Sequence, residues 1–195
     1  MLQRLAAAAN ALQGSLKAAL IALVCTVSLG LSGCVSSGGG LQSYVDSIDG
    51  YRFAYPIGWV QVQLTQEGGP DVVFRDLINS TENVSVVIND IPGDQTLAEL
   101  GSPTEVGYRL QKSALAPENS GRTAELVNAE SFDVADKTFY LLEYLVKLPD
   151  QVRHDLATVV VHRGQLYTLN ASTTEERWER VKGMMRQVVT SFAVS

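Results

Sequence analysis

The feature that most restricts the fold is a pair of β-branched runs joined by a two-residue turn. The runs read LATVVVH over residues 156–162 and QLYTLNA over residues 165–171, with Arg163-Gly164 between them. Such a short connection is typical of an antiparallel β-hairpin, because parallel strands need a crossover of a dozen or more residues. The sequence therefore predicts an antiparallel sheet in this part of the chain.

Further extended runs lie before this hairpin. Glycine, proline and short polar turns separate runs over residues 51–55, 59–64, 71–77, 83–89, 123–133 and 138–147. The domain that contains them is expected to begin near Tyr44 and to end at Ser195. These runs predict that most of the domain is sheet.

Two segments carry helix signals. Residues 102–105, Ser-Pro-Thr-Glu, have the pattern of a capping box with proline at the first helical position. Residues 173–176 have a second capping signature, and apolar residues then recur at helical spacing from Trp178 to Phe192. We interpret that stripe as the core-facing side of a helix. The fold class expected is α+β, with a central, mainly antiparallel sheet flanked by helices in an α/β/α sandwich.

The N-terminal third of the sequence has a different character. Residues 1–33 contain Arg4 and Lys17 but no acidic residue, and residues 18–31 are fourteen uncharged residues. That run is shorter than the ~18 to 20 apolar residues that a membrane-spanning helix needs. A basic start, a short apolar run and small residues at its end predict a secretory signal peptide over residues 1–33.

A cysteine follows this predicted signal directly. Residues 31–34, Leu-Ser-Gly-Cys, resemble the lipobox of bacterial lipoproteins, in which the signal is removed and a diacylglyceryl group is attached to the cysteine. We predict that Cys34 is lipidated and that residues 34–43, which include a serine and glycine run, are a flexible linker. Two or more acyl chains anchor a protein stably, whereas one does not. The open alternatives are an uncleaved signal anchor and an ordinary signal peptide with an incidental cysteine.

The charge of the predicted mature chain limits its partners. Removal of residues 1–33 leaves 162 residues, enough for one domain, with 13 basic and 21 acidic side chains and a net charge of −8. An acidic surface argues against nucleic acid and against anionic lipid surfaces as partners. A protein or a cation is expected instead.

Common catalytic motifs are absent from the sequence. It contains no G-x-S-x-G elbow, no H-E-x-x-H, no Walker loop and no G-x-G-x-x-G. The sequence does not exclude a Ser/His/Asp triad, because its members need not be adjacent in sequence. We expect no enzyme activity, and a hydrolase is the least favoured reading.

Two histidines are the remaining candidates for chemistry. His154 and His162 would lie ~26 Å apart along one strand, so they cannot share a metal. Asp155 is adjacent to His154, and the hairpin could return Glu175 toward it. An imidazole with one or two carboxylates suits a labile divalent cation. The alternative is a surface histidine beside solvated acids.

Several blocks in the right order resemble the PsbP family, and its cyanobacterial branch in particular because of the lipobox. The resemblance covers about residues 44–192. Its residues are DGYRFAYPIGW (49–59), VFRD (73–76), NVSVVI (83–88), LGSPTEV (100–106), YLLEYLVK (140–147), RGQLYTLNA (163–171) and ERW (176–178).

The resemblance implies an extrinsic, non-enzymatic accessory of photosystem II, on the lumenal side of a cyanobacterial thylakoid membrane. It implies the lumenal subunits of the photosystem as partners and a role in assembly, stability or the oxygen-evolving complex. It also implies a divalent-cation site at His154 and Glu175. Asp155 is a further candidate because it is adjacent to His154 in the sequence. Zinc, manganese or calcium would bind labilely, and no tightly bound cofactor is expected. The alternative function is a lumenal or periplasmic lipoprotein that binds and delivers a divalent metal or small ligand.

Overall fold

The computed structural model describes residues 40–64, 68–93 and 95–195. The predicted signal peptide, Cys34 and most of the predicted linker lie outside these residues. Among the described residues, no helix is long and apolar enough to cross a bilayer.

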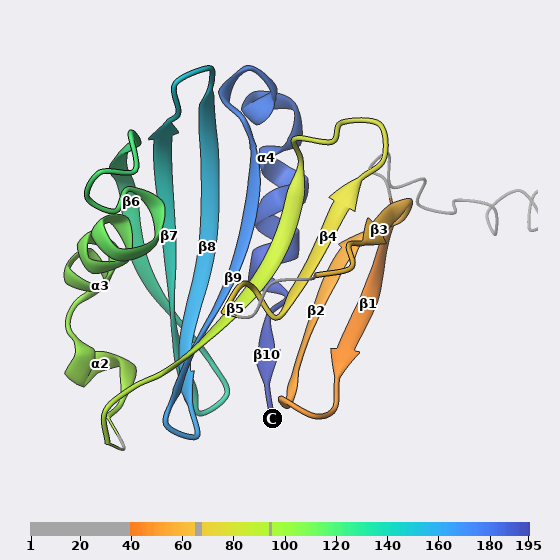
Figure 1. Ribbon diagram of the computed structural model, residues 1–195. Coiled ribbons are helices and arrows are strands. Elements are labelled where there is room, and N and C mark those ends of the chain that lie inside the picture. The colour runs from red at the N-terminus through yellow and green to blue at the C-terminus, as the bar shows by residue number, and fades with distance from the viewer. Residues whose placement is uncertain (1–39, 65–67, 94) are drawn as a thin grey trace, which may run out of the picture. The chain divides into compact units, whose positions relative to one another are not determined.

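A seven-stranded antiparallel sheet forms the centre of the domain (Figure 1). Its spatial order is β3-β4-β5-β9-β8-β7-β6. The strands are β3 (Trp59–Gln61), β4 (Val72–Asp76), β5 (Asn83–Asp90), β6 (Thr123–Val134), β7 (Lys137–Lys147), β8 (Val152–His162) and β9 (Gln165–Thr174).

The predicted hairpin is confirmed as β8 and β9. His162 pairs with Gln165, and both turn residues have positive φ, 50° at Arg163 and 74° at Gly164. Two successive positive φ values are typical of the type I′ turn, whose twist matches that of the flanking strands. The pairing continues to Arg153 and Thr174, so each strand is longer than its β-branched run predicted.

A smaller sheet has the order β1-β2-β10, with β1 at Leu41–Asp46, β2 at Tyr51–Pro56 and β10 at Ala193–Val194. Because β1 begins at Leu41, the ordered domain starts three residues before the expected boundary at Tyr44. Residues 41–43 are therefore strand rather than linker. Their Cα partners in β2, from Pro56 to Ala54, supply the order that their own composition does not indicate.

One face of the large sheet is covered by the small sheet and by α4 (Glu175–Thr190). Tyr51 and Phe53 of β2 pack in one core cluster with Met185, Val188 and Val189 of α4. The stripe predicted for this helix is confirmed for those three residues, which are fully buried. Its first residue, Trp178, is only half-buried and packs at the edge of the cluster.

The opposite face is covered by shorter elements. These are α2 (Leu97–Leu100), α3 (Pro103–Leu110) and the π-helix η2 (Gln111–Leu115). Leu97 and Val106 pack on Tyr140, Leu142 and Tyr144 of β7 in a second core cluster. Helices thus lie on both faces of the sheet, and the predicted α/β/α arrangement is confirmed (Figure 1).

The two helix starts fit their capping signatures differently. At α3, Ser102 Oγ accepts from Glu105 N–H and Glu105 Oε2 accepts from Ser102 N–H, which is the predicted capping box. At α4, Thr174 occupies the N-cap position but its side chain makes no capping hydrogen bond. The helix start was predicted correctly, whereas the capping contact was not, because Thr174 is the N-cap and its N3 position holds Arg177 instead of a glutamate.

Candidate functional site

His154 lies near the start of β8, on the face of the sheet that α4 covers. The register pairs it with Leu145 of β7 and Thr173 of β9, and only 4% of the residue is exposed. A buried position inside a strand contradicts the surface-histidine alternative. The ionisable ring therefore needs hydrogen-bonding partners within the protein.

Both ring nitrogens of His154 contact carboxylates. Nδ1 lies 2.6 Å from Oε2 of Glu175, and Nε2 lies 2.7 Å from Oε1 of Glu143. Glu175 is the first residue of α4, which follows β9 directly, so the β8–β9 hairpin returns it to His154. The structure therefore brings together the two residues that the sequence singled out.

Glu143 was not predicted. It lies on β7, where Leu145 pairs with His154 and Glu143 with Leu156. Alternate residues of a strand share a face, so Glu143 lies diagonally across from His154. Antiparallel pairing around the short turn at residues 148–151 is the sequence signal that could have found it.

Trp178 closes one side of the site. Its ring stacks on the imidazole of His154 with centroids 3.7 Å apart and planes 8° apart. Trp178 lies three residues after Glu175, so one turn of α4 presents both side chains to His154. An aromatic face against an imidazole favours the ring when it carries positive charge.

The geometry bears on the charge of the site. A carboxylate oxygen only accepts hydrogen bonds, so each contact is a hydrogen bond when the ring nitrogen that it faces carries a proton. Glu143 and Glu175 thus offer an acceptor to each of the two ring nitrogens of His154. The side chain of Glu175 is 46% exposed and that of Glu143 is 20% exposed, so solvent reaches the site through the carboxylates.

The same donor set suits a divalent cation that replaces one of these protons. A tetrahedral ion with bonds of about 2.1 Å holds its ligands about 3.4 Å apart, which is wider than the 2.6 Å between His154 and Glu175. Glu175 would therefore have to move outward, and its exposure permits this. Because Glu143 and Glu175 contact opposite ring nitrogens, one ion bound at Nδ1 would have His154 and Glu175 as its protein ligands. An imidazole and a carboxylate fit zinc or manganese once Nδ1 has lost its proton.

Asp155, the third candidate ligand, lies on the opposite face of the sheet. It accepts a hydrogen bond from Ser172 Oγ, and Ser172 in turn accepts from Arg153 Nε at 2.9 Å. Burial raises the pKa of the Asp155 carboxyl above its ordinary value, although Ser172, Arg153 and His154 act to lower it. Adjacent residues of a strand point to opposite faces, and this excludes Asp155 from the site of His154.

Comparisons with known proteins place the chain in a family. The PsbP family model matches residues 39–194. The chain belongs to the PsbP family.

Two relatives of this PsbP-family protein are named CyanoP. The protein from Thermosynechococcus vestitus is 52% identical, with 84% of this chain and 91% of the relative covered. The protein from a Synechocystis strain is 45% identical, with 94% and 99% covered. PsbP-like protein 1 of Arabidopsis thaliana, a chloroplastic protein, is 38% identical, with 85% and 69% covered.

A solved structure supports the fold of this PsbP-family domain. The solution structure of cyanobacterial PsbP from Synechocystis has a TM-score of 0.70 and 47% identity, and the match covers 85% of this chain and 99% of that one. A structure of protein Mog1, 12% identical with a TM-score of 0.52, shares the fold alone.

A buried carboxylate joins the site of this PsbP-family chain to a loop. Glu82, between β4 and β5, accepts hydrogen bonds from Thr173 Oγ1 and Arg177 Nε. Thr173 is the β9 partner of His154, and Arg177 precedes Trp178 on α4. The β4–β5 loop and the first turn of α4 are therefore tied together behind the site.

An acidic cluster lies at the other end of the domain. Side-chain oxygens of Asp46, Asp49 and Asp71 lie within 4.8 Å of one another. Burial and the two neighbouring carboxylates raise the pKa of Asp49. Tyr44 and Tyr51 donate hydrogen bonds to Asp46 and Asp71 respectively. Two of the three carboxylates therefore have hydrogen-bond donors within the protein, so their proximity needs no bound ion to explain it.

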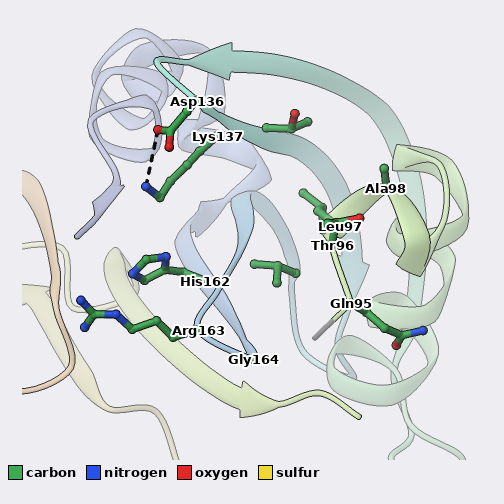
Figure 2. A pocket seen from close by; sticks show the side chains of 11 residues that line it. Gln95, Thr96, Leu97, Ala98, Asp136, Lys137, His162, Arg163 and Gly164 are labelled. Atoms are coloured by element: carbon green, nitrogen blue, oxygen red, sulfur yellow. Dashed lines mark ion pairs between the residues drawn. The ribbon is translucent and has the colours of Figure 1, made fainter. Parts of the chain in front are cut away.

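Figure 2 shows a pocket of about 380 Å³, which lies between the β6–β7 turn, the β8–β9 turn and α2. Lys137, at its rim, makes an ion pair with Asp136 at 3.6 Å. His162 lines the pocket, and its buried Nε2 has no hydrogen-bond partner among the described residues. His162 and His154 lie at opposite ends of β8, so this pocket is separate from the candidate metal site.

Proposed function

We propose that this chain is an extrinsic accessory lipoprotein of photosystem II, held at the lumenal side of a cyanobacterial thylakoid membrane. The observation that carries this proposal is the family membership, with two relatives named CyanoP matched over at least 91% of their own length. It supports assembly or stability of the photosystem or its oxygen-evolving complex and catalyses no reaction. Its partners are lumenal subunits of the photosystem, and the lipid on Cys34 links it to the membrane.

Crosslinking followed by mass spectrometry on isolated thylakoid membranes tests the partner. We expect crosslinks between lysines of this chain, such as Lys137 and Lys182, and lumenal segments of photosystem II subunits. A membrane preparation from a strain without photosystem II is the control. Crosslinks only to metal-transport proteins would contradict the proposal and would favour the delivery function.

The anchor has its own test. Cys34 follows the apolar run and precedes the glycine-rich segment, so Cys34→Ser should leave an uncleaved precursor or a soluble protein. Membrane fractionation and the mass of the N-terminal peptide measure this. Normal cleavage together with retention on the membrane would show that lipidation is not the anchor.

A second function, binding and delivery of a divalent cation, is favoured by one observation. His154 is held between two carboxylates that reach solvent, and its Nδ1 together with Oε2 of Glu175 supplies two ligand atoms on the more exposed side. Two protein ligands of mixed type, His154 and Glu175, would leave the remaining positions to water or to a partner. The site would therefore hold a cation labilely.

Calorimetric titration of the domain with zinc, manganese and calcium tests this function. Zinc and manganese should bind more tightly than calcium, which prefers a shell of oxygen ligands. Binding should weaken at acid pH, where the imidazole keeps its proton. His154→Ala should abolish the heat, whereas His162→Ala should leave it unchanged. Equal heats for both variants and the parent protein would exclude the site.

A further inference from the structure

Three large aliphatic side chains are exposed together at one end of the domain. Ile57 in the β2–β3 turn is 64% exposed, and Leu77 and Ile78 in the β4–β5 loop are 66% and 90% exposed. Trp59 pairs with Asp76, so the strand register continues toward Ile57 opposite Ile78. These three residues are called the apolar tip below. Contiguous exposed apolar residues of this kind mark interaction surfaces, whereas single ones do not.

The apolar tip lies where the chain enters the domain. Ile57 N–H donates to the carbonyl of Gly40 at 2.9 Å, and a Cβ placed on Gly40 would lie 2.9 Å from Ile57 Cδ1. The side chain of Ile57 therefore rests against the residue that precedes β1. The start of β1, the β2–β3 turn and the β4–β5 loop meet at the upper right of Figure 1.

Hydrogen bonds hold the loop that carries Leu77 and Ile78. Asp76 accepts from Ile78 N–H at 2.9 Å and from Asn79 Nδ2 at 2.8 Å, and Glu82 N–H donates to the carbonyl of Asn79 at 2.7 Å. Glu82 itself is buried against α4. The outward direction of Leu77 and Ile78 is thus fixed by the fold.

The chain segments around the apolar tip carry no charge, which favours their contact with an uncharged surface. Residues 34–45, 53–66 and 77–81 contain no charged side chain. The cluster of Asp46, Asp49 and Asp71 lies instead at the far ends of β1 and β4. Burying an unpaired charge against lipid is costly, so these uncharged segments suit an apolar phase better than the acidic cluster does.

The length of chain between the predicted anchor and the domain is short. Six Cα–Cα steps separate Cys34 from Gly40, which extend to at most about 20 Å and average about 13 Å for a glycine-rich segment. A lipidated Cys34 therefore keeps Gly40, and the Ile57 side chain beside it, close to the bilayer surface.

We infer that the apolar tip inserts into the lipid surface that holds Cys34 and so orients the domain on the membrane. This inference rests on the lipid anchor proposed above. The occupant is the interfacial layer of the bilayer, since shallow burial of aliphatic side chains adds to the hold of an acyl anchor. Its consequence is that the His154 site, at the same end of the sheet, faces the membrane side of the lumen.

Photocrosslinking tests the insertion. The proposed mature chain, residues 34–195, is coupled through the sulfur of Cys34 to a maleimide lipid in phosphatidylcholine vesicles, which imposes the tether. A p-benzoylphenylalanine replaces Ile78 in one variant and Ile48 in the matched control. Both isoleucines are 90% exposed, and Ile48 lies in the β1–β2 turn at the opposite end of β1. We expect several-fold more lipid adducts from position 78.

Equal adduct yields at the two positions would overturn the inference. A third variant with Ile57, Leu77 and Ile78 changed to serine should keep its thermal midpoint, since the side chains are exposed. A probe that replaces the exposed Ser80 should prefer lipid over the position-48 control in the parent protein and should lose that preference in this variant. On native membranes, adducts of position 78 to protein instead of lipid would overturn it in favour of a protein partner. The mass of the native N-terminal peptide measures lipidation separately, so failure of the anchor and failure of the insertion are distinguishable.

Discussion

The two faces of the seven-stranded sheet are stabilised in different ways. The α4 face has an extensive aromatic and aliphatic core, to which the small sheet and one long helix contribute. The α3 face has a smaller core, and two tyrosines of β7 fasten its short helices by donating to backbone carbonyls, Tyr140 to Gly101 at 2.9 Å and Tyr144 to Gly107 at 3.0 Å. Non-directional packing suffices for a long helix, whereas short helices with little buried area need directed bonds.

Strand β8 presents a buried ionisable residue to each face. His154 meets two carboxylates that solvent reaches, while Asp155 meets a serine hydroxyl inside the protein. The first arrangement can exchange a proton for a cation, because its partners can move outward. The second can only contribute to structure. Access of the partners to solvent therefore distinguishes a candidate site from a structural contact.

The largest effect is expected on the α4 face. Met185→Ala removes a fully buried side chain, so the free energy of unfolding should fall by about 2–5 kcal/mol. Chemical denaturation measures the loss, and Met184→Ala, at a half-buried neighbouring position, is the matched control. Equal losses for the two variants would show that the helix face is not packed as described.

Trp178→Ala should have a smaller effect than a fully buried tryptophan would. Its indole is half-buried and stacks on His154, so a loss of about 1–3 kcal/mol is expected, below the ~3–5 kcal/mol of a core site. Trp178→Phe keeps an aromatic face over the imidazole and should recover most of the loss. Thermal unfolding of the two variants tests the stack, and identical midpoints would contradict it.

Loss of one hydrogen bond on the α3 face should lower the free energy of unfolding by less than the two substitutions above. Tyr144→Phe removes one hydroxyl that donates to Gly107, which typically lowers the free energy of unfolding by about 0.5–1.5 kcal/mol. Tyr108→Phe, on the exposed side of α3, is the control and should have no effect. Chemical denaturation measures both variants. If both had the free energy of unfolding of the parent protein, the hydrogen bond of Tyr144 would not stabilise the contact between α3 and the sheet.

The smallest effect on the free energy of unfolding is expected at Asp155. Here the substitution should stabilise the protein as pH rises, whereas the other substitutions destabilise it. Burial raises the pKa of Asp155 in the folded protein above the ordinary value of 3.8, so the folded state binds its proton more tightly than the unfolded chain. Stability from this group is therefore greatest below pH 3.8 and is lost as pH rises through the raised pKa.

Asp155→Asn keeps an acceptor for Ser172 Oγ but does not ionise. Its free energy of unfolding relative to the parent protein should rise as pH increases from the acid range to neutrality. Denaturation at a series of pH values, with Asp136→Asn as an exposed control, measures this difference. A difference that stays constant with pH would contradict the expected titration of Asp155.

Local patterns predicted most of the fold, and the exceptions have physical reasons. Residues 41–43 lack strand composition and are ordered by pairing with β2. Thr96 and Glu99 form a capping box before α2, but that helix is one turn long and was not predicted. At the site, the hairpin brought Glu175 to His154, whereas Glu143 required the register of β7. Asp155 could have been excluded from alternation along β8 alone.

The candidate site is built entirely from consecutive segments. Glu143, His154, Glu175 and Trp178 come from β7, β8 and the start of α4, which belong to the uninterrupted succession β7–β8–β9–α4 along the chain. Contacts that are close in sequence close small loops and form early in folding. We therefore expect this subassembly to acquire structure before β1 and β10 pair with β2, so that the ligands are arranged while the chain is still completing its fold.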